Sequence, residues 1–292
     1  MPAPETRVPP TAWIEAIFFP PDSQTARGLV RELKRAGAAR VWQAERRVLS
    51  LWPDAPASRA ALKAWADLET PPRVRELVLR DPGREWAPAP LVEPGPGLRL
   101  APAWGGAVAG PEVLIIDPLT AFGAGDHPST WLNLHLLLRL LQGEWGEPPG
   151  PGSWAADVGA GSGVLALALA LKGGLRVAAV DPDPASRRAV GLNRRLNPLA
   201  GGLVHFLTGD HRALGGQFPL VAANLPGALL RALAPDLAAL VAPGGRLVVS
   251  GFRDEAGGET AERFLAQGLA EIARAWRHGW EGQLWRQPPG GD

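Results

Sequence analysis

Short apolar runs alternate with longer helix-forming segments from Ser153 to the end of the chain. The apolar runs predict β-strands at 154–158, 175–180, 203–207, 220–223 and 246–250, because strands buried on both faces are almost continuously hydrophobic. Helices are predicted between them at 163–171, 184–196, 227–240 and 259–269. This alternation is typical of a parallel sheet with helices on both faces. The last segments, 272–277 and 283–286, predict an antiparallel pair. We therefore expect an α/β domain that is doubly wound, Rossmann-like and closed by a C-terminal antiparallel hairpin.

The first part of the chain, residues 1–80, shows a different order of elements. Alternating or β-rich stretches predict strands at 13–19, 40–43, 47–52 and 73–79. Helices are predicted at 23–36, where Asp22 or Ser23 can act as the N-cap, and at 58–68,. The resulting order, β-α-β-β-α-β, is that of a ferredoxin-like α+β domain.

A stretch rich in proline and glycine, residues 81–110, separates this domain from the rest. It contains Trp86 and Trp104, and flexible Gly/Ser linkers seldom contain large aromatic side chains. We therefore expect an ordered connector. A strand at 113–116 and a helix from Ser129 or Thr130 to about residue 141 follow it, so the predicted divisions are 1–80, 81–110 and 111–292.

The composition is that of a globular protein, with 46% hydrophobic and 20% charged residues among 292, and 30 basic residues against 29 acidic ones. This balance lacks the positive charge typical of nucleic-acid binding, so we expect no direct nucleic-acid partner. Cysteine is absent, which excludes disulfides, thiolate metal sites and a cysteine nucleophile,. The five histidines show no H-x-x-x-H spacing, so we expect no metal site.

Neither a membrane span nor a secretory signal is expected. The longest apolar run, 164–171, ends at Lys172 and is far shorter than the roughly 20 residues that a membrane helix needs. Residues 1–10 lack the basic-then-apolar pattern of a signal peptide. We expect a soluble, cytoplasmic protein without a membrane partner. The sequence leaves its oligomeric state open and favours a monomer.

Three glycines, Gly159, Gly161 and Gly163, lie where the strand at 154–158 turns into a helix. Without Cβ atoms the backbone can adopt positive φ and approach a ligand closely. The spacing is G-x-G-x-G, and residue 164 is Val, whereas dinucleotide folds need G-x-G-x-x-G and a P-loop needs G-K-[ST]. The loop therefore favours a ligand whose amino-acid part lies over it without a pyrophosphate, of which S-adenosylmethionine is the common example.

Two acids flank this loop. Asp181 ends the second strand, about 20 residues past the glycines, where a carboxylate accepts hydrogen bonds from ribose hydroxyls. The alternative is that Asp181 caps the following helix, although Asp183 is the better candidate for that cap. Asp157 is expected to support the loop by accepting backbone N–H bonds, and otherwise to be a solvated loop acid.

Polar residues also follow the third and fourth strands. Gly209 and Asp210 come after the third strand, where they would border an adenine or form a plain turn. Asn224 follows the fourth strand. Its carbonyl oxygen could hold a substrate amine, and the alternative is an ordinary turn residue.

These residues, with the segment Ala121-Phe122-Gly123-Ala124-Gly125-Asp126-His127-Pro128-Ser129-Thr130 ahead of them, resemble the PrmA family. Its members methylate large-subunit ribosomal protein eleven with S-adenosylmethionine. The family pattern F-G-T-G-x-H-x-T-T is present from Phe122 to Thr130, with Ala124 and Ser129 in place of two threonines and Pro219 where an aspartate is typical.

The resemblance implies a role for each matching position. Thr130, Gly159, Asp181 and Asn224 would contact the cofactor or the reacting amine, and Phe122 to Gly125 would fold over the methionine part. The small N-terminal domain would recognise the ribosomal protein substrate. The implied function is an S-adenosylmethionine-dependent N-methyltransferase acting on amino groups, with Asn224 as the catalytic residue.

Other interpretations remain open at this point. The chain could be a degenerate module that binds adenosylmethionine or a ribosomal protein with little catalysis, or a methyltransferase for another protein or a small molecule. A nucleic-acid base methyltransferase is disfavoured, because Asn224-Leu225-Pro226-Gly227 lacks the aromatic residue that stacks on a flipped base. An NAD enzyme is disfavoured by Val164. His127 could be a general base, but a structural hydrogen-bonding role is favoured, as it is for His135 and His205.

Overall fold

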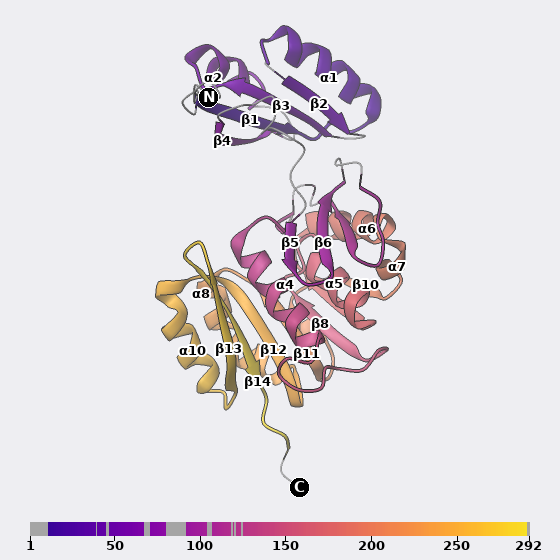
Figure 1. Cartoon of the computed structure of the whole chain (residues 1–292), viewed down its shortest axis with the longest axis vertical. Coiled ribbons are helices and arrows are strands. Elements are labelled where there is room, and N and C mark those ends of the chain that lie inside the picture. The colour runs from indigo at the N-terminus through magenta and orange to yellow at the C-terminus, as the bar shows by residue number, and fades with distance from the viewer. Residues whose placement is uncertain are drawn as a thin grey trace, which may run out of the picture. The chain divides into compact units, whose positions relative to one another are not determined.

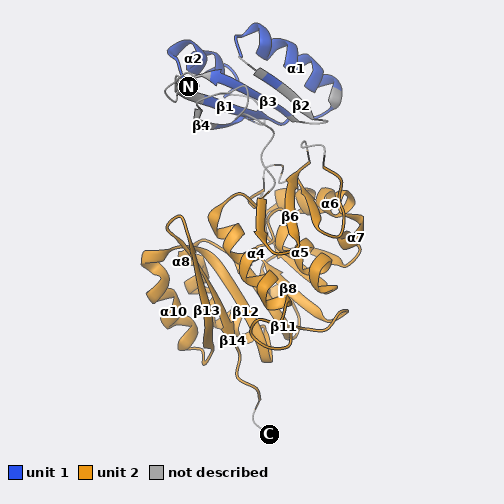
Figure 2. Cartoon of the chain, viewed as in Figure 1, with its two compact units in different colours: residues 1–90, 104–106 blue, residues 91–103, 107–292 orange. Residues whose placement is uncertain are grey.

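The computed structural model describes residues 11–38, 40–44, 47–66, 71–79, 92–103, 107–117, 119, 121–123 and 125–290. The chain divides into two compact units (Figure 2). Unit 1 comprises residues 1–90 and 104–106, and unit 2 comprises residues 91–103 and 107–292.

The described residues of unit 1 form a four-stranded antiparallel sheet with two helices. Its elements are β1 (Thr11–Phe18), α1 (Ser23–Arg35), β2 (Arg40–Ala44), β3 (Arg47–Pro53), α2 (Pro56–Lys63) and β4 (Arg73–Leu79). The strand order is β2-β3-β1-β4 (Figure 1). The predicted order of elements is confirmed, although α2 begins at Pro56, whose fixed φ suits the first turn of a helix, and ends at Lys63.

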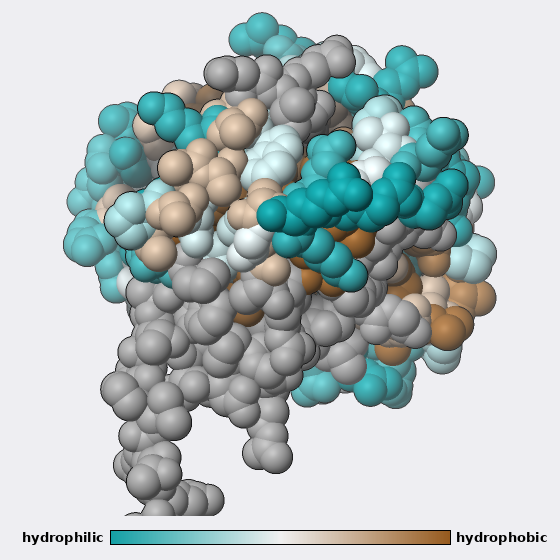
Figure 3. Space-filling model, turned by 90° about the horizontal axis from the view of Figure 1, so that it is seen from above, coloured by the Kyte–Doolittle hydropathy of each residue, from teal (hydrophilic) through white to brown (hydrophobic). Residues whose placement is uncertain are grey.

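The core of unit 1 follows from the alternation of β1. Ile14, Ala16 and Phe18 are buried together with Ala26 and Leu33 of α1. The N-cap of α1 is Asp22, whose Oδ1 accepts a hydrogen bond from the Thr25 N–H at 2.7 Å. The outer side of α1 is charged, with Arg31, Glu32, Lys34 and Arg35 exposed. Figure 3 shows a hydrophilic band across the face of the molecule seen from above.

Unit 2 is built on a seven-stranded sheet of order β10-β9-β8-β11-β12-β14-β13 (Figure 1). The strands are β8 (Trp154–Val158), β9 (Arg176–Asp181), β10 (Val204–Thr208), β11 (Phe218–Asn224), β12 (Val241–Arg253), β13 (Ala270–Arg277) and β14 (Trp280–Arg286). Neighbouring strands are parallel from β10 to β12, whereas β14 is antiparallel to both β12 and β13. The predicted sheet and its closing hairpin are confirmed.

Helices cover both faces of this sheet. They are α4 (Pro128–Leu141), α5 (Val164–Gly173), α6 (Pro184–Leu196), α7 (Pro198–Gly201), α8 (Gly227–Ala232), α9 (Ala234–Ala239) and α10 (Gly257–Leu265). One buried apolar cluster includes residues of α4 to α7, and a second includes residues of α8 to α10. In α5 every residue from Val164 to Ala170 is buried, which explains its uniformly apolar sequence.

Two helices near the C-terminus also differ from their predicted bounds. The helix predicted at 227–240 is divided into α8 and α9 at Leu233, because Pro235 has no N–H and its ring obstructs an uninterrupted helix. The helix predicted at 259–269 begins at Gly257 and ends at Leu265. Gly268 lies in the following turn with φ +80°.

A third, small sheet lies in unit 2 where a connector was expected. It has the order β5-β6-β7, formed by β5 (Val92–Gly95), β6 (Leu98–Pro102) and β7 (Val113–Ile116). Of these strands only β7 was predicted. Leu98 and Leu100 are buried in the same cluster as α4 and α5, so residues 92–103 contribute to the core. Trp86 and Trp104 lie outside the described residues.

Candidate functional site

The residues predicted to form the site converge on one edge of the seven-stranded sheet. The glycine loop follows β8, Asp181 ends β9, Gly209 follows β10 and Asn224 ends β11. These four strands are parallel neighbours (Figure 1), so their carboxyl ends lie at the same edge. The chain order of the strands reverses between β8 and β11, which is where open α/β sheets bind ligands.

The glycine loop needs its glycines for backbone conformation and for close contact. Gly159, Gly161 and Gly163 have φ of +78°, +53° and +79°, a region that other residues seldom adopt. A Cβ on Gly161 would lie 2.6 Å from the carbonyl oxygen of Phe122. The loop is therefore pressed against the segment that contains Phe122.

The Asp181 carboxylate joins the glycine loop to the end of β9. Its Oδ2 accepts a hydrogen bond from the Gly161 N–H, and its Oδ1 accepts one from the Asp183 N–H, each at 2.8 Å. Asp183 is the N-cap of α6, because its Oδ1 accepts from the Ala185 N–H at 2.8 Å. The prediction that Asp183 rather than Asp181 caps this helix is confirmed.

Asp157 lies fully buried beneath the loop. Its Oδ2 accepts a hydrogen bond from the Ala166 N–H in the first turn of α5, at 3.1 Å, and within the described part of the chain its Oδ1 has no hydrogen-bond partner. Burial is the main cause that raises the pKa of this carboxyl to about 7; the Ala166 bond opposes the rise and the charge of Asp181 adds to it. The alternative of a solvated loop acid is wrong.

The segment ahead of α4 lies over the glycine loop. Ser162 donates from its backbone N–H to the Phe122 carbonyl at 2.9 Å and from its hydroxyl to the Gly123 carbonyl at 2.5 Å. The Phe122 ring is 54% exposed and meets the ring of His127 at 5.1 Å between centroids. Ala124 lies outside the described residues.

His127 is the N-cap of α4, so this helix begins at Pro128 and not at Ser129 or Thr130 as predicted. Its Nδ1 accepts a hydrogen bond from the Ser129 N–H at 3.2 Å, and its ring lies 4.5 Å from that of Trp280. Burial lowers the pKa of His127, partly offset by Asp126. The neutral ring that results can accept at Nδ1, which supports the structural role favoured above.

A buried polar network holds Asn224 at the end of β11. Its Nδ2 donates to Thr130 Oγ1 at 3.1 Å, and its Oδ1 lies 3.2 Å from Ser250 Oγ. Ser250 Oγ also contacts the Ser129 carbonyl at 3.0 Å and accepts from Asn133 Nδ2 at 3.1 Å. Thr130 and Asn224, predicted as site residues, are thus brought into direct contact.

Ser250 and Asn133 were missed by the sequence analysis. Both are fully buried, and Asn133 is a polar residue in an otherwise apolar stretch of α4. That isolated polar position is the signal that could have found it. Ser250 gave no such signal, because a serine at a strand end is common.

Gly209 and Asp210 form a turn beside Asp181. The Gly209 N–H donates to the Asp181 backbone carbonyl at 3.1 Å. Asp210 Oδ1 accepts from the Arg212 N–H at 2.9 Å and caps a 3₁₀ turn, His211–Ala213. An adenine contact by these two residues stays a prediction.

The described residues lack the features of two other classes of site. No three histidine, aspartate or glutamate side chains come together there as metal ligands. Within the same residues, no helix has the length and apolar character needed to cross a membrane.

The sheet, with its strand order and its covering helices, has the fold of the α/β methyltransferases. A solved structure has the same fold: ribosomal protein L11 methylase from Lactobacillus delbrueckii subsp. bulgaricus superimposes with a TM-score of 0.58. The alignment covers 68% of this chain and 98% of that one at 23% sequence identity, so this likeness concerns the fold alone.

Sequence comparison identifies the family. The family model described as ribosomal protein L11 methyltransferase (PrmA) matches residues 84–286. A ribosomal protein L11 methyltransferase from Chloroflexus aurantiacus is 35% identical over 245 residues, which cover 75% of this chain and 72% of that protein. One from Pelotomaculum thermopropionicum is 38% identical over 186 residues, covering 63% and 58%. The chain belongs to the ribosomal protein L11 methyltransferase (PrmA) family, and the predicted resemblance is confirmed.

Proposed function

We propose that this protein transfers methyl groups from S-adenosylmethionine to amino groups of ribosomal protein L11. The observation that supports this most strongly is the meeting of the glycine loop, Asp181 and Asn224 at one sheet edge in a chain of the PrmA family. The substrate is inferred from the names of the protein's relatives. The methyl donor is inferred from the polar groups and glycines at this edge of the sheet.

The side chains at the edge suit a donor made of a methionine and a nucleoside. Each oxygen of Asp181 accepts one backbone N–H and keeps a lone pair for a ribose hydroxyl. The unpartnered Oδ1 of Asp157 adds a buried acceptor beneath the loop. In this proposal the donor is held by Phe122, Gly123, Thr130, Asp157, Gly159, Gly161, Gly163, Asp181, Gly209, Asp210 and Asn224. When bound, S-adenosylmethionine supplies an electrophilic methyl group on a sulfonium centre.

The chain itself must hold a neutral amine in line with that methyl group. An α-amino group, with a pKa of about 7.7–8, is partly neutral near pH 7, whereas a lysine near 10.4 needs a desolvating environment. The Asn224 carbonyl oxygen has two lone pairs, so it can accept from the amine as well as from Ser250. Direct displacement needs little more than such positioning.

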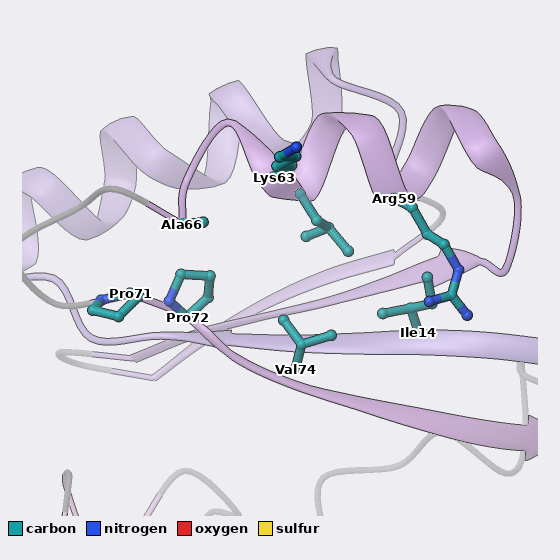
Figure 4. A pocket seen from close by; sticks show the side chains of 8 residues that line it. Ile14, Arg59, Lys63, Ala66, Pro71, Pro72 and Val74 are labelled. Atoms are coloured by element: carbon teal, nitrogen blue, oxygen red, sulfur yellow. The ribbon is translucent and has the colours of Figure 1, made fainter.

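Unit 1 is proposed to be a ferredoxin-like domain that grips the protein substrate. Its element order and its strand order, β2-β3-β1-β4, are compatible with that fold. A pocket of about 280 Å³ lies between α2 and β4, lined partly by Ile14, Leu62 and Val74. Figure 4 shows Val74 pointing from the strand toward α2, and this side chain is 54% exposed. An apolar segment of the ribosomal protein would fill such a pocket.

A two-part assay tests the proposal on the full chain. Calorimetric titration with adenosylhomocysteine measures donor-site binding, and transfer of a radiolabelled methyl group to recombinant ribosomal protein L11 measures activity. We expect both to be positive. Binding without transfer would indicate a module that has lost catalysis, and absence of binding would refute the assignment of the donor site.

A further inference from the structure

Two asparagines, Asn193 in the last turn of α6 and Asn197 at its C-cap, take the place of a neighbouring strand along β7. Both are buried and lie one helical turn apart. Asn197 Oδ1 accepts from the Ile115 N–H at 2.8 Å while its Nδ2 donates to the Ile115 carbonyl at 2.7 Å. Asn193 holds Asp117 in the same way, at 2.8 and 3.0 Å. Because β7 pairs with β6 on its other side, the two carboxamides provide the hydrogen bonds that a second strand would otherwise supply.

Asn193 makes one contact that Asn197 lacks. Its Nδ2 also donates to the Ser162 carbonyl of the glycine loop, at 2.9 Å. One carboxamide therefore joins Asp117, where the segment ahead of α4 begins, to the loop that the segment covers. A second connection lies further along, where Ser162 donates to the carbonyls of Phe122 and Gly123.

One described residue between these two connections, Leu119, has an unusual backbone conformation. Leu119 has φ +51°, which is uncommon for a residue other than glycine. Its N–H donates to Asp117 Oδ1 at 2.8 Å. Such a backbone persists only where the surrounding contacts hold it. Asn193 supplies the contact at the base of the segment, because it bonds both Asp117 and the Ser162 carbonyl.

We infer that Asn193 is a positioning residue for cofactor binding, an inference that rests on the proposed function. It sets the segment with Phe122 and Gly123 against the glycine loop before the donor arrives, so less conformational freedom is lost on binding. Asn197 holds β7 through Ile115 but, among the described residues, has no hydrogen bond to the glycine loop. The hydrogen bonds of the two asparagines distinguish their roles, because only Asn193 bonds the glycine loop.

The test compares Asn193→Ala with Asn197→Ala in the full chain. Each variant removes one buried carboxamide that clasps β7, so we expect similar losses in thermal unfolding temperature. Only Asn193→Ala should raise the Kd for adenosylhomocysteine, by about tenfold, because one buried hydrogen bond to the loop is lost. The KM for S-adenosylmethionine should rise likewise, with the KM for the protein acceptor unchanged.

A further variant, Ser162→Ala, covers the case in which Asn193→Ala does not fold. It removes the hydroxyl that donates to the Gly123 carbonyl and accepts from the Val164 N–H at 3.3 Å, and we expect a Kd about threefold higher with a near-native unfolding temperature. Equal Kd values for the two asparagine variants, or an unchanged Kd in Ser162→Ala when Asn193→Ala is unfolded, would overturn the inference while the proposed function stands. No binding by the wild-type chain would overturn both.

Discussion

The Asp181 carboxylate accepts a hydrogen bond from the Gly161 N–H at 2.8 Å. The acid that ends β9 thus holds the loop that follows β8, in addition to its proposed contact with the ribose. One side chain therefore connects two neighbouring strand ends at the edge where the donor is proposed to bind.

Replacement of Asp181 tests its contribution to donor binding. Asp181→Ala should weaken adenosylhomocysteine binding by about 1–3 kcal/mol, because charge-assisted hydrogen bonds are lost. Asp183→Ala is the matched control, since it removes a neighbouring acid that only caps α6. Calorimetry on both variants measures the difference. Tight binding by Asp181→Ala would leave this residue a purely structural role.

The buried carboxyl of Asp157 predicts a pH-dependent stability. Its pKa in the folded protein is raised from 3.8 to about 7, so between these values the folded state binds more protons than the unfolded state. The free energy of unfolding should therefore fall as pH rises from about 4 to about 7, by up to about 1.4 kcal/mol per pH unit. Above about pH 7 this contribution is lost completely.

The isosteric variant Asp157→Asn isolates that effect. It cannot ionise and keeps an oxygen for the Ala166 N–H, so its stability should exceed that of the wild type at pH 8 and approach it near pH 4. Denaturant unfolding at several pH values measures this, with exposed Asp254→Asn as the control. If the free energies of unfolding of the wild type and of Asp157→Asn change with pH in parallel, the raised pKa of Asp157 is contradicted.

Ser250 is predicted to act through Asn224. Ser250→Ala removes the hydroxyl 3.2 Å from Asn224 Oδ1 and should lower kcat by about tenfold with little change in the Kd for adenosylhomocysteine, because Asn224 loses its orientation. Thr260→Ala is the control, since Thr260 also has a buried hydroxyl bonded to a backbone carbonyl, but within α10. An equal loss of kcat in both variants would indicate a general loss of stability.

The pocket of unit 1 is tested by placing a charge in it. Val74→Asp should raise the KM for the ribosomal protein by about tenfold, because burial of apolar surface in the pocket is lost, and should leave the KM for a short amine-bearing peptide unchanged. Val108→Asp, at an exposed valine of unit 2, is the control. The full chain is needed, since truncation at residue 111 would remove β5 and β6 from unit 2. Equal KM changes for both acceptors would argue against a gripping role.

The helices and strands that could be predicted are those marked by residues close together in the sequence, such as an apolar run or a helix cap. Strands β8, β9 and β11 are mostly apolar and buried because both faces are covered, and Asp183 followed by a proline marks the start of α6. The division of 227–240 into α8 and α9 was missed, although Pro235 lies inside that range and a proline interrupts a helix,. Strands β5 and β6 were missed because Pro94 and Gly95 are typical of loops.

The residues alone were enough to indicate the class of fold, the glycine loop and the positions after each strand, because periodicity and turn chemistry depend on neighbours along the chain. Which side chains meet was decided by tertiary packing. Asn193 contacts Asp117, 76 positions away, and Ser250 contacts Asn224 and Asn133 from two other elements. Such contacts depend on how strands and helices pack in three dimensions, and no local pattern records that arrangement.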